Sequence, residues 1–140
     1  MNYMKNSKTK TSIDARPKTI FCDIDGVLFK HYGLDLDARS REDTEVLNGV
    51  KKTFRQWESN GYNIILVTGR RESEREVTKK QLEKARLKYD KLIMGIGGGV
   101  RVLINDKKPT GENTAISFNL NRNEGLSSIN IWNINLWMNQ

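Results

Sequence analysis

The sequence predicts an α/β fold, a three-layer α/β/α sandwich with a central, mostly parallel sheet. Short apolar segments alternate along the chain with segments of helical periodicity, as in βαβ units with right-handed crossovers. The early apolar segments also stop abruptly at polar residues, as buried strands of parallel sheets do. A chain of 140 residues, 36% of them hydrophobic, has the size of one domain with one core.

The elements are located by the spacing of their apolar residues. Helices are predicted at residues 44–59 and 72–89, where apolar side chains recur every three or four positions. The glycines of residues 95–99 predict a flexible loop, with phosphate binding as an equal alternative. Apolar runs without helical spacing predict strands at residues 19–22, 63–67, 91–94 and 100–104, with an edge strand at 114–120.

Residues 1–17 differ from the rest of the chain. They lack apolar periodicity and end in Pro17, which predicts a disordered basic leader followed by a single domain at residues 18–140. The formal net charge is +7, and most of the excess lies in this leader and in residues 70–91. Because a leader and a solvated helix face account for most of the charge, it is only weak evidence for nucleic acid as the partner, which stays an open alternative.

Nothing in the sequence points to a membrane or to an oxidising compartment. No stretch approaches the roughly 20 apolar residues that span a bilayer, and the first residues do not resemble a signal peptide. The single cysteine, Cys22, cannot form an internal disulfide and is expected to fill space in a buried strand. We therefore expect a cytoplasmic protein with no membrane partner.

Polar side chains follow three of the predicted strands. Asp23 and Asp25 come after the first strand, Thr68 after the second, and Asn105 and Asp106 after the fourth. Ligands bind beyond the carboxyl ends of parallel strands, so these residues are expected to meet in space. Carboxylate and amide oxygens are ligands that suit Mg²⁺, so the sequence predicts a site for Mg²⁺ and a phosphate.

The same strand ends resemble the motifs of a known family. FCDIDGVL at residues 21–28 resembles the first motif of the haloacid dehalogenase (HAD) superfamily of phosphohydrolases, and LVTGR at residues 66–70 resembles the second. LIND at residues 103–106 resembles the acidic fourth motif. The resemblance extends from about Lys18 to Leu126, and it implies a Rossmann-like core and phosphatase activity.

The resemblance implies a role for each matching residue. Asp23 would attack phosphorus to form an aspartyl-phosphate. Asp25 would protonate the leaving oxygen and later take a proton from the attacking water. Thr68 would donate its hydroxyl to a phosphoryl oxygen beside the N–H of Gly69, and Gly26 would let the backbone leave the strand sharply.

Mg²⁺ is the cofactor that the resemblance implies. Its ligands would be the Asp23 carboxylate, the Asp25 backbone carbonyl and the fourth motif, Asn105 and Asp106. The fourth motif of the family commonly has two acids. The uncharged Asn105 therefore implies either weaker metal binding or Asp106 as the main ligand.

The third motif of the family is a lysine that is missing from the expected loop. Residues 94–99, MGIGGG, contain no cation. We favour Lys107 as its replacement, because it follows the acidic motif directly. The other cationic candidates are Arg101, Lys108, Lys91 and Lys79.

The intervals between the motifs leave no room for the cap domain common in this family. Only 18 residues separate Asp25 from the predicted helix at Thr44. The site is therefore expected to be open, or closed by a neighbouring subunit or by a flap at residues 29–40 in which His31 and Tyr32 could touch substrate. Arg70 is expected either to bind a second anionic group or to lie in a solvated helix start.

The carboxyl-terminal tail contains Trp132 and Trp137, which require burial. They are expected either to cover the sheet or to form the interface of a homo-oligomer.

These observations predict a Mg²⁺-dependent phosphomonoester hydrolase that acts through an aspartyl-phosphate on a small phosphorylated metabolite. Resemblance to compact bacterial family members, at residues 95–106 and 121–126, implies a sugar phosphate of surface-polysaccharide metabolism. The first alternative is a polynucleotide 3′-phosphatase, favoured by the open site and the basic charge. The second is a catalytically weakened phosphate-binding or regulatory protein, favoured by Asn105 and the missing lysine.

Overall fold

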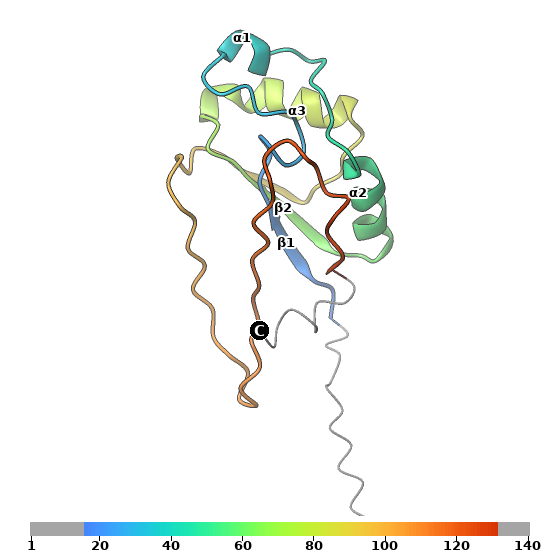
Figure 1. Ribbon diagram of the computed structural model, residues 1–140, viewed down its shortest axis with the longest axis vertical. Helices are drawn as coiled ribbons and strands as arrows, with labels where there is room; N and C mark the ends of the chain where they lie inside the picture. The colour runs from blue at the N-terminus through green and yellow to red at the C-terminus, as the bar shows by residue number, and fades with distance from the viewer. Residues whose placement is uncertain (1–15, 132–140) are drawn as a thin grey trace, which may run out of the picture.

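Three parallel strands form the sheet on which the fold is built (Figure 1). The structure is a computed structural model, and it describes residues 16–131. The predicted α/β fold on a parallel sheet is confirmed, and the three observed strands agree with the predicted ones to within one residue. They pair in the order β1 (Thr19–Cys22), β2 (Asn63–Val67) and β3 (Lys91–Ile93).

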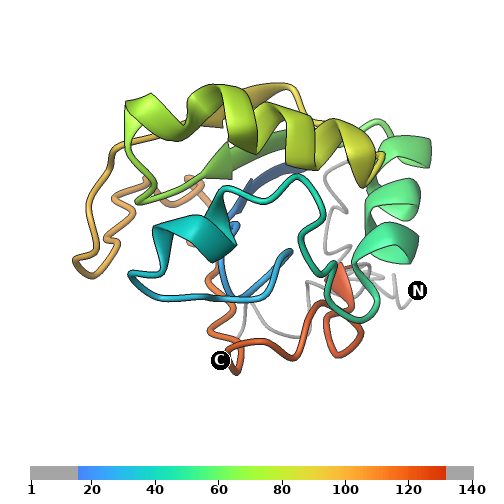
Figure 2. The same cartoon turned by 90° about the horizontal axis from the view of Figure 1, so that it is seen from above.

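The connections between the strands carry the helices. α2 (Val50–Ser59) precedes β2, and α3 (Arg75–Lys84) precedes β3 after a single 3₁₀ turn, η1 (Glu72–Glu74). A four-residue helix, α1 (Leu36–Arg39), lies in the long loop after β1. Figure 2 shows α1 beside α3, so this loop is folded back against the second main helix.

The first main helix begins six residues later than the predicted start at residue 44. Val46 forms an isolated bridge with Phe29, and the N–H of Leu47 donates to the carbonyl of Leu28 at 2.9 Å. These backbone bonds draw the segment toward the loop after β1 and away from helical geometry. The helix then starts after Gly49, whose φ is +74°.

The second main helix ends at Lys84 and does not reach residue 89. Arg86 has a φ of +56°, which breaks the helical path. The N–H of Leu87 donates back to the carbonyl of Leu82 at 3.0 Å, closing the helix end.

Strand alternation explains which face of the sheet is buried. Cys22, Ile64 and Leu66 point to one face and are at most 6% exposed. Because the three strands are consecutive in both the chain and the sheet, right-handed crossovers place α2 and α3 on the same face. The opposite face is more open, since Phe21 is 58% exposed and Ile93 is 42% exposed.

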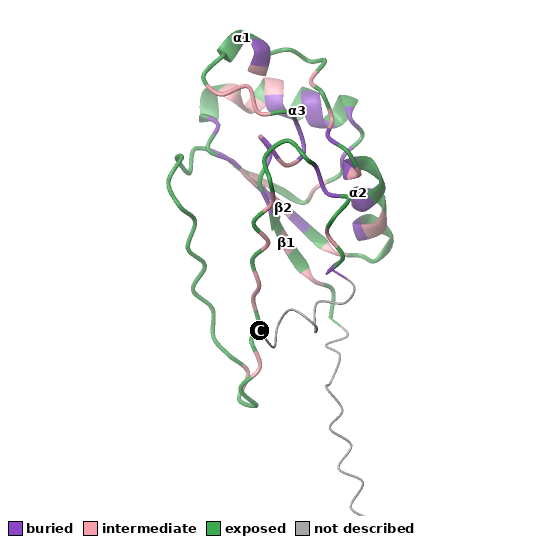
Figure 3. Ribbon diagram, viewed as in Figure 1, coloured by how far each residue is buried: buried purple, intermediate pink, exposed green. Residues whose placement is uncertain are grey.

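The predictions of strands at residues 100–104 and 114–120 are wrong in this structure. Neither segment pairs with another strand, and Val100 and Ile104 are at least 90% exposed. A strand is stabilised by backbone hydrogen bonds to a neighbouring strand. β1 lies at the edge of the sheet and pairs only with β2, so residues 100–104 form no such bonds with it. Figure 3 shows the long segment after β3 exposed over most of its length.

The expectation that the domain has no cap is confirmed. Within residues 16–131, the connection between β1 and β2 contains only the helices α1 and α2, and the connection between β2 and β3 contains only η1 and α3. None of the described helices has the length and apolar character needed to cross a membrane. The predicted leader, apart from its last two residues, and both tail tryptophans lie outside the described residues.

Candidate active site

A pocket of about 530 Å³ lies at the carboxyl ends of β1 and β2. It contains six of the predicted site residues, Asp23, Asp25, Gly26, Thr68, Gly69 and Arg70. A larger hollow of about 920 Å³ lies at the other end of the sheet, near Asn63 and Asp90. Of the candidates from the sequence, that hollow contains Lys79 but neither aspartate of the first motif nor any residue of the second motif, so the smaller pocket is the candidate active site.

Asp23 is the first residue after β1, and its carboxylate reaches the pocket. The Oδ1 atom accepts a hydrogen bond from the N–H of Ile24 at 2.8 Å, which fixes the side chain at the strand end. The residue as a whole is exposed, but partial burial of the carboxylate raises its pKa. The bond from Ile24 and the nearby charge of Arg101 act in the opposite direction without cancelling this effect.

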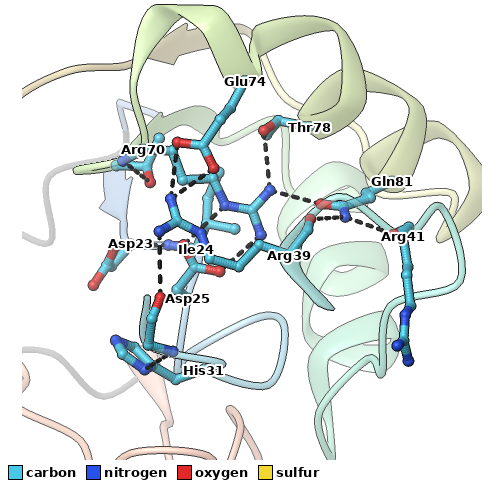
Figure 4. A network of polar contacts seen from close by, with 12 residues as sticks. Asp23, Ile24, Asp25, His31, Arg39, Arg41, Arg70, Glu74, Thr78 and Gln81 are labelled. Atoms are coloured by element: carbon cyan, nitrogen blue, oxygen red, sulfur yellow. Dashed lines mark hydrogen bonds and ion pairs between the residues drawn. The ribbon is translucent and has the colours of Figure 1, made fainter. Parts of the chain in front are cut away.

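Asp25 is held by Arg70 through two parallel hydrogen bonds (Figure 4). The guanidinium Nε and Nη2 donate to Oδ2 at 2.8 Å and Oδ1 at 2.7 Å. Arg70 is itself fixed from α3, where its Nη1 donates to Thr78 Oγ1 at 3.0 Å and to Gln81 Oε1 at 2.6 Å. The backbone reaches this position by turning at Gly26, which has a φ of +86°.

The prediction that Arg70 binds a second anionic group, or lies in a solvated helix start, is corrected by this geometry. Its side chain is 1% exposed and fully engaged by Asp25, Thr78 and Gln81. The guanidinium therefore positions the carboxylate of Asp25 and offers no free edge to a substrate.

The second motif brings the glycine loop to the pocket. Thr68 is 1% exposed, and its Oγ1 accepts from the N–H of Arg70 at 3.1 Å. A Cβ atom on Gly69 would lie 2.8 Å from the carbonyl oxygen of Gly97 and 3.8 Å from Arg101 Nη2. Only glycine permits this close approach, which sets the loop and Arg101 beside the second motif.

The structure places Arg101 in the pocket as a cation that acts on the predicted nucleophile, Asp23. It lines the pocket, its charge acts on Asp23, and its Nη1 donates to the Gly99 carbonyl at 2.6 Å. The favoured candidate, Lys107, is exposed and does not line the pocket. Arg101 is among the candidates that the sequence leaves open. Lys107 is favoured there because it lies next to the acidic motif in the chain, but residues 100–104 do not join the sheet, so that motif and Lys107 lie apart from the pocket.

The predicted fourth motif lies apart from the pocket. Asn105 and Asp106 are exposed, and both are connected to Thr114: its hydroxyl accepts from the Asn105 amide and donates to the Asp106 carbonyl. They miss the site because residues 100–104 do not join the sheet. Among the described residues, no group of three or more histidines, cysteines and acids could hold a metal ion.

The pocket itself retains two of the predicted oxygen ligands for Mg²⁺, the Asp23 carboxylate and the Asp25 backbone carbonyl. The Asp25 carboxylate is occupied by Arg70. Mg²⁺ commonly keeps several waters and binds proteins through one or two carboxylates together with a substrate phosphate. The donor set in the pocket therefore fits a largely hydrated Mg²⁺.

The flap after β1 borders the pocket and is tied to α3. Arg39 donates to both carboxylate oxygens of Glu74, at 2.7 and 2.8 Å. Gln81 Nε2 donates to the carbonyls of Arg39 and Arg41, so the residue that fixes Arg70 also fixes the flap (Figure 4). His31 and Tyr32 line the pocket, as the flap prediction requires.

Arg122 is a charged pocket residue to which the sequence assigned no role at the site, although it lies in the segment 121–126 that resembles other family members. It lies far from the motifs in the chain, and its Cγ is 3.1 Å from the position of a Cβ atom on Gly26. No local pattern signals this proximity, because it depends on how the segment after residue 120 folds back over the first motif.

Comparisons with known proteins agree with this site. Residues 17–101, more than half of the chain, match the family model of the polynucleotide kinase PNKP phosphatase domain. No curated protein matches the chain significantly.

Solved structures show the same relationship. A chain of the Pnkp1/Rnl/Hen1 RNA repair complex is 32% identical with a TM-score of 0.50, over 58% of this chain and 26% of that one. A second structure of the Pnkp1/Rnl/Hen1 complex gives 29% identity and a TM-score of 0.51, over 66% of this chain and 35% of the other. The chain thus spans about a third or less of these relatives.

A structural-genomics protein from Vibrio cholerae shares the fold alone, at 16% identity and a TM-score of 0.54 over 87% of this chain and 97% of that one. The family match covers both aspartates of the first motif and the Thr-Gly-Arg of the second. The chain therefore belongs to the PNKP phosphatase-domain family and is a HAD-like phosphatase.

Proposed function

We propose that this phosphatase hydrolyses phosphomonoesters with Mg²⁺ through an aspartyl-phosphate on Asp23. The observation that carries the proposal is the pairing of two aspartates in one pocket with different surroundings. Asp23 has only the N–H of Ile24 as a hydrogen-bond donor within the described residues, whereas both oxygens of Asp25 are held by Arg70. One carboxylate is thus left to attack, and the other is oriented for proton transfer.

The first step forms the bond between Asp23 and phosphorus and breaks the bond to the leaving oxygen. Asp25 gives its proton to that oxygen as it departs. In the second step, Asp25 takes a proton from water, the water oxygen attacks phosphorus, and the Asp23 carboxylate is released with inorganic phosphate. Both proton transfers use the carboxylate that Arg70 orients.

The phosphoryl oxygens require positive groups as charge develops on them. Thr68 and the N–H of Gly69 supply donors at the end of β2, and Arg101 supplies a cation beside Gly69. Mg²⁺, when bound, would add positive charge between nucleophile and phosphate, held by the Asp23 carboxylate and the Asp25 backbone carbonyl.

For the substrate, we infer a polynucleotide 3′-phosphate end. Support comes from the family match to a polynucleotide kinase phosphatase domain and from the RNA repair complexes among the structural relatives. The pocket has no cap above it within the described residues, which suits a long substrate. A sugar phosphate of polysaccharide metabolism is the competing prediction, and it rests on sequence resemblance alone.

A substrate panel separates these classes. The full chain with Mg²⁺ is assayed for phosphate release from one oligonucleotide carrying either a 3′-phosphate or a 5′-phosphate, as RNA and as DNA, and from hexose 1- and 6-phosphates. We expect the 3′-phosphorylated oligonucleotide to have the highest kcat/KM, with a KM that rises with salt. A higher kcat/KM for a hexose phosphate, independent of salt, would instead support the sugar-phosphate prediction.

A further inference from the structure

The turn at residues 121–126 is fixed against the first motif by bonds from distant parts of the chain. The N–H of Asn123 donates to the Gly26 carbonyl at 2.8 Å, and Asn123 Oδ1 accepts from the N–H of His31 at 2.7 Å. At its other end, the N–H of Leu126 donates to the Asn48 carbonyl at 2.9 Å. Figure 1 shows this red-orange segment passing over the end of β1 and on toward α2.

The close packing of the turn makes it a firm support. Gly125 has a φ of +79°, and a Cβ atom there would lie 2.0 Å from the Asn48 carbonyl oxygen. Leu126 is 1% exposed and belongs to the core. A segment held in this way fixes the backbone from which the side chain of Arg122 extends, and Arg122 lines the pocket.

Arg122 is a cation of the pocket without a carboxylate partner among the described residues. Two other pocket arginines are neutralised, Arg39 by Glu74 and Arg70 by Asp25. The acid nearest to Arg122 in the chain, Glu124, instead accepts a hydrogen bond from Asn121 Nδ2 at 3.1 Å. The turn therefore presents an uncompensated guanidinium to the pocket.

The two arginines that face the pocket without a carboxylate partner flank different motifs. Arg101 lies beside Gly69 of the second motif and acts on the nucleophile Asp23. Arg122 lies over Gly26, directly after Asp25, the residue that serves the leaving oxygen. Arg101 is thus placed for the phosphoryl group that is transferred, and Arg122 for the group that leaves.

We infer that Arg122 is a specificity residue that binds a second phosphate carried by the leaving group. A guanidinium offers two parallel donors that match phosphate oxygens, and a fixed backbone reduces the entropy lost on binding. The inference rests on the proposed function for the direction of the leaving group. If the leaving group were an alcohol without a phosphate of its own, Arg122 would have no anionic group of the substrate to bind.

Binding to a chain that cannot turn over tests the inference. In the Asp23→Asn background with Mg²⁺, calorimetry compares two ligand pairs that differ by one phosphate, 3′-AMP with adenosine 3′,5′-bisphosphate and glucose 6-phosphate with glucose 1,6-bisphosphate. We expect the bisphosphate of at least one pair to bind about tenfold more tightly. Adding Arg122→Gln should reduce that ratio to about twofold or less, while Arg122→Lys should retain part of it.

Arg55→Gln is the matched control, because Arg55 is an exposed arginine on α2 that does not line the pocket. It should leave the ratio unchanged. Equal binding of both members of both pairs, or a ratio that survives Arg122→Gln, would overturn the inference. Hydrolysis of p-nitrophenyl phosphate by the unmodified chain separates failure of the proposed reaction from failure of the role of Arg122. Turnover without tighter binding of the bisphosphates refutes only the role of Arg122. Tighter binding of a bisphosphate without turnover refutes the proposed reaction.

Discussion

The guanidinium of Arg70 holds the carboxylate of Asp25 by two hydrogen bonds of 2.7 and 2.8 Å from a position that is 1% exposed. Planar guanidinium and carboxylate groups match in this arrangement, which fixes orientation as well as distance. Arg70 therefore connects the core, through Thr78 and Gln81 of α3, to the group that moves the proton.

We predict that Arg70→Lys lowers kcat for p-nitrophenyl phosphate by about 10²-fold, because a lysine keeps the charge but cannot hold both oxygens of Asp25. The loss of the bonds to Thr78 and Gln81 should also lower the free energy of unfolding by about 1–3 kcal/mol. Steady-state kinetics and urea unfolding measure the two effects.

The control for this prediction is Arg71→Lys, the adjacent exposed arginine. This variant should keep kcat within about twofold and the free energy of unfolding within about 0.5 kcal/mol of the unmodified chain. If Arg70→Lys matched this control in kcat, Arg70 would not position Asp25.

Arg101 and Lys107 make opposite predictions for the missing third motif. Arg101 lines the pocket and Lys107 does not, so Arg101→Gln should lower kcat/KM by about 10²–10³-fold. Lys107→Gln should remain within about twofold of the unmodified chain. Phosphate-release assays on both variants decide the matter, and a large loss in Lys107→Gln alone would restore the sequence-based choice.

Gly125, the glycine of the turn that carries Arg122, should be harder to replace than Gly111. Gly125 and Gly111 both have positive φ, +79° and +89°, but only Gly125 has backbone where a Cβ atom would lie. Gly111→Ala should cost about 1 kcal/mol from backbone strain. Gly125→Ala should cost at least about 2 kcal/mol more, because the chain must also move away from Asn48.

Urea unfolding of the two glycine variants gives the difference directly. Since the strain is similar in both, the difference isolates the steric clash. Equal costs would show that the turn is not packed against Asn48.

Cys22 should be chemically inert in the folded chain. Burial, with a smaller effect from the charge of Asp23, raises its pKa to about 12, and the residue is 6% exposed. At pH 8 the thiolate fraction is then only about 10⁻⁴, and iodoacetamide should react with the native chain far more slowly than with the urea-unfolded one. Mass spectrometry of both samples measures this, and equal labelling would contradict the buried placement.

Local patterns in the sequence were sufficient to predict where the first two strands end. The apolar runs ending at Cys22 and Val67 set two of the three strands of the sheet, so Asp23, Asp25 and Thr68 lie at one edge as predicted. These elements depend on alternation and on parallel pairing, both of which can be read locally.

Features that depend on distant contacts could not be predicted in this way. The apolar run at residues 100–104 has the composition of a strand, yet composition does not determine whether β1 accepts a partner. Arg70 ends the second motif, and the sequence predicts for it either an anionic group of the substrate or a solvated helix start, because the sequence does not show that Thr78 and Gln81 hold its side chain in the core. Arg122 reaches the pocket only through the bonds of Asn123 to the first motif.

The central claim is that Asp23 is the nucleophile of a Mg²⁺-dependent phosphatase. It is tested most directly by phosphate release from p-nitrophenyl phosphate, with Mg²⁺ and with EDTA, by the unmodified chain, by Asp23→Asn, and by Asp43→Asn as a control at a surface carboxylate paired with Lys84. We predict Mg²⁺-dependent turnover that Asp43→Asn retains and that Asp23→Asn lowers by at least about 10³-fold. Turnover that persists in Asp23→Asn, or phosphate binding without any turnover in the unmodified chain, would contradict the claim.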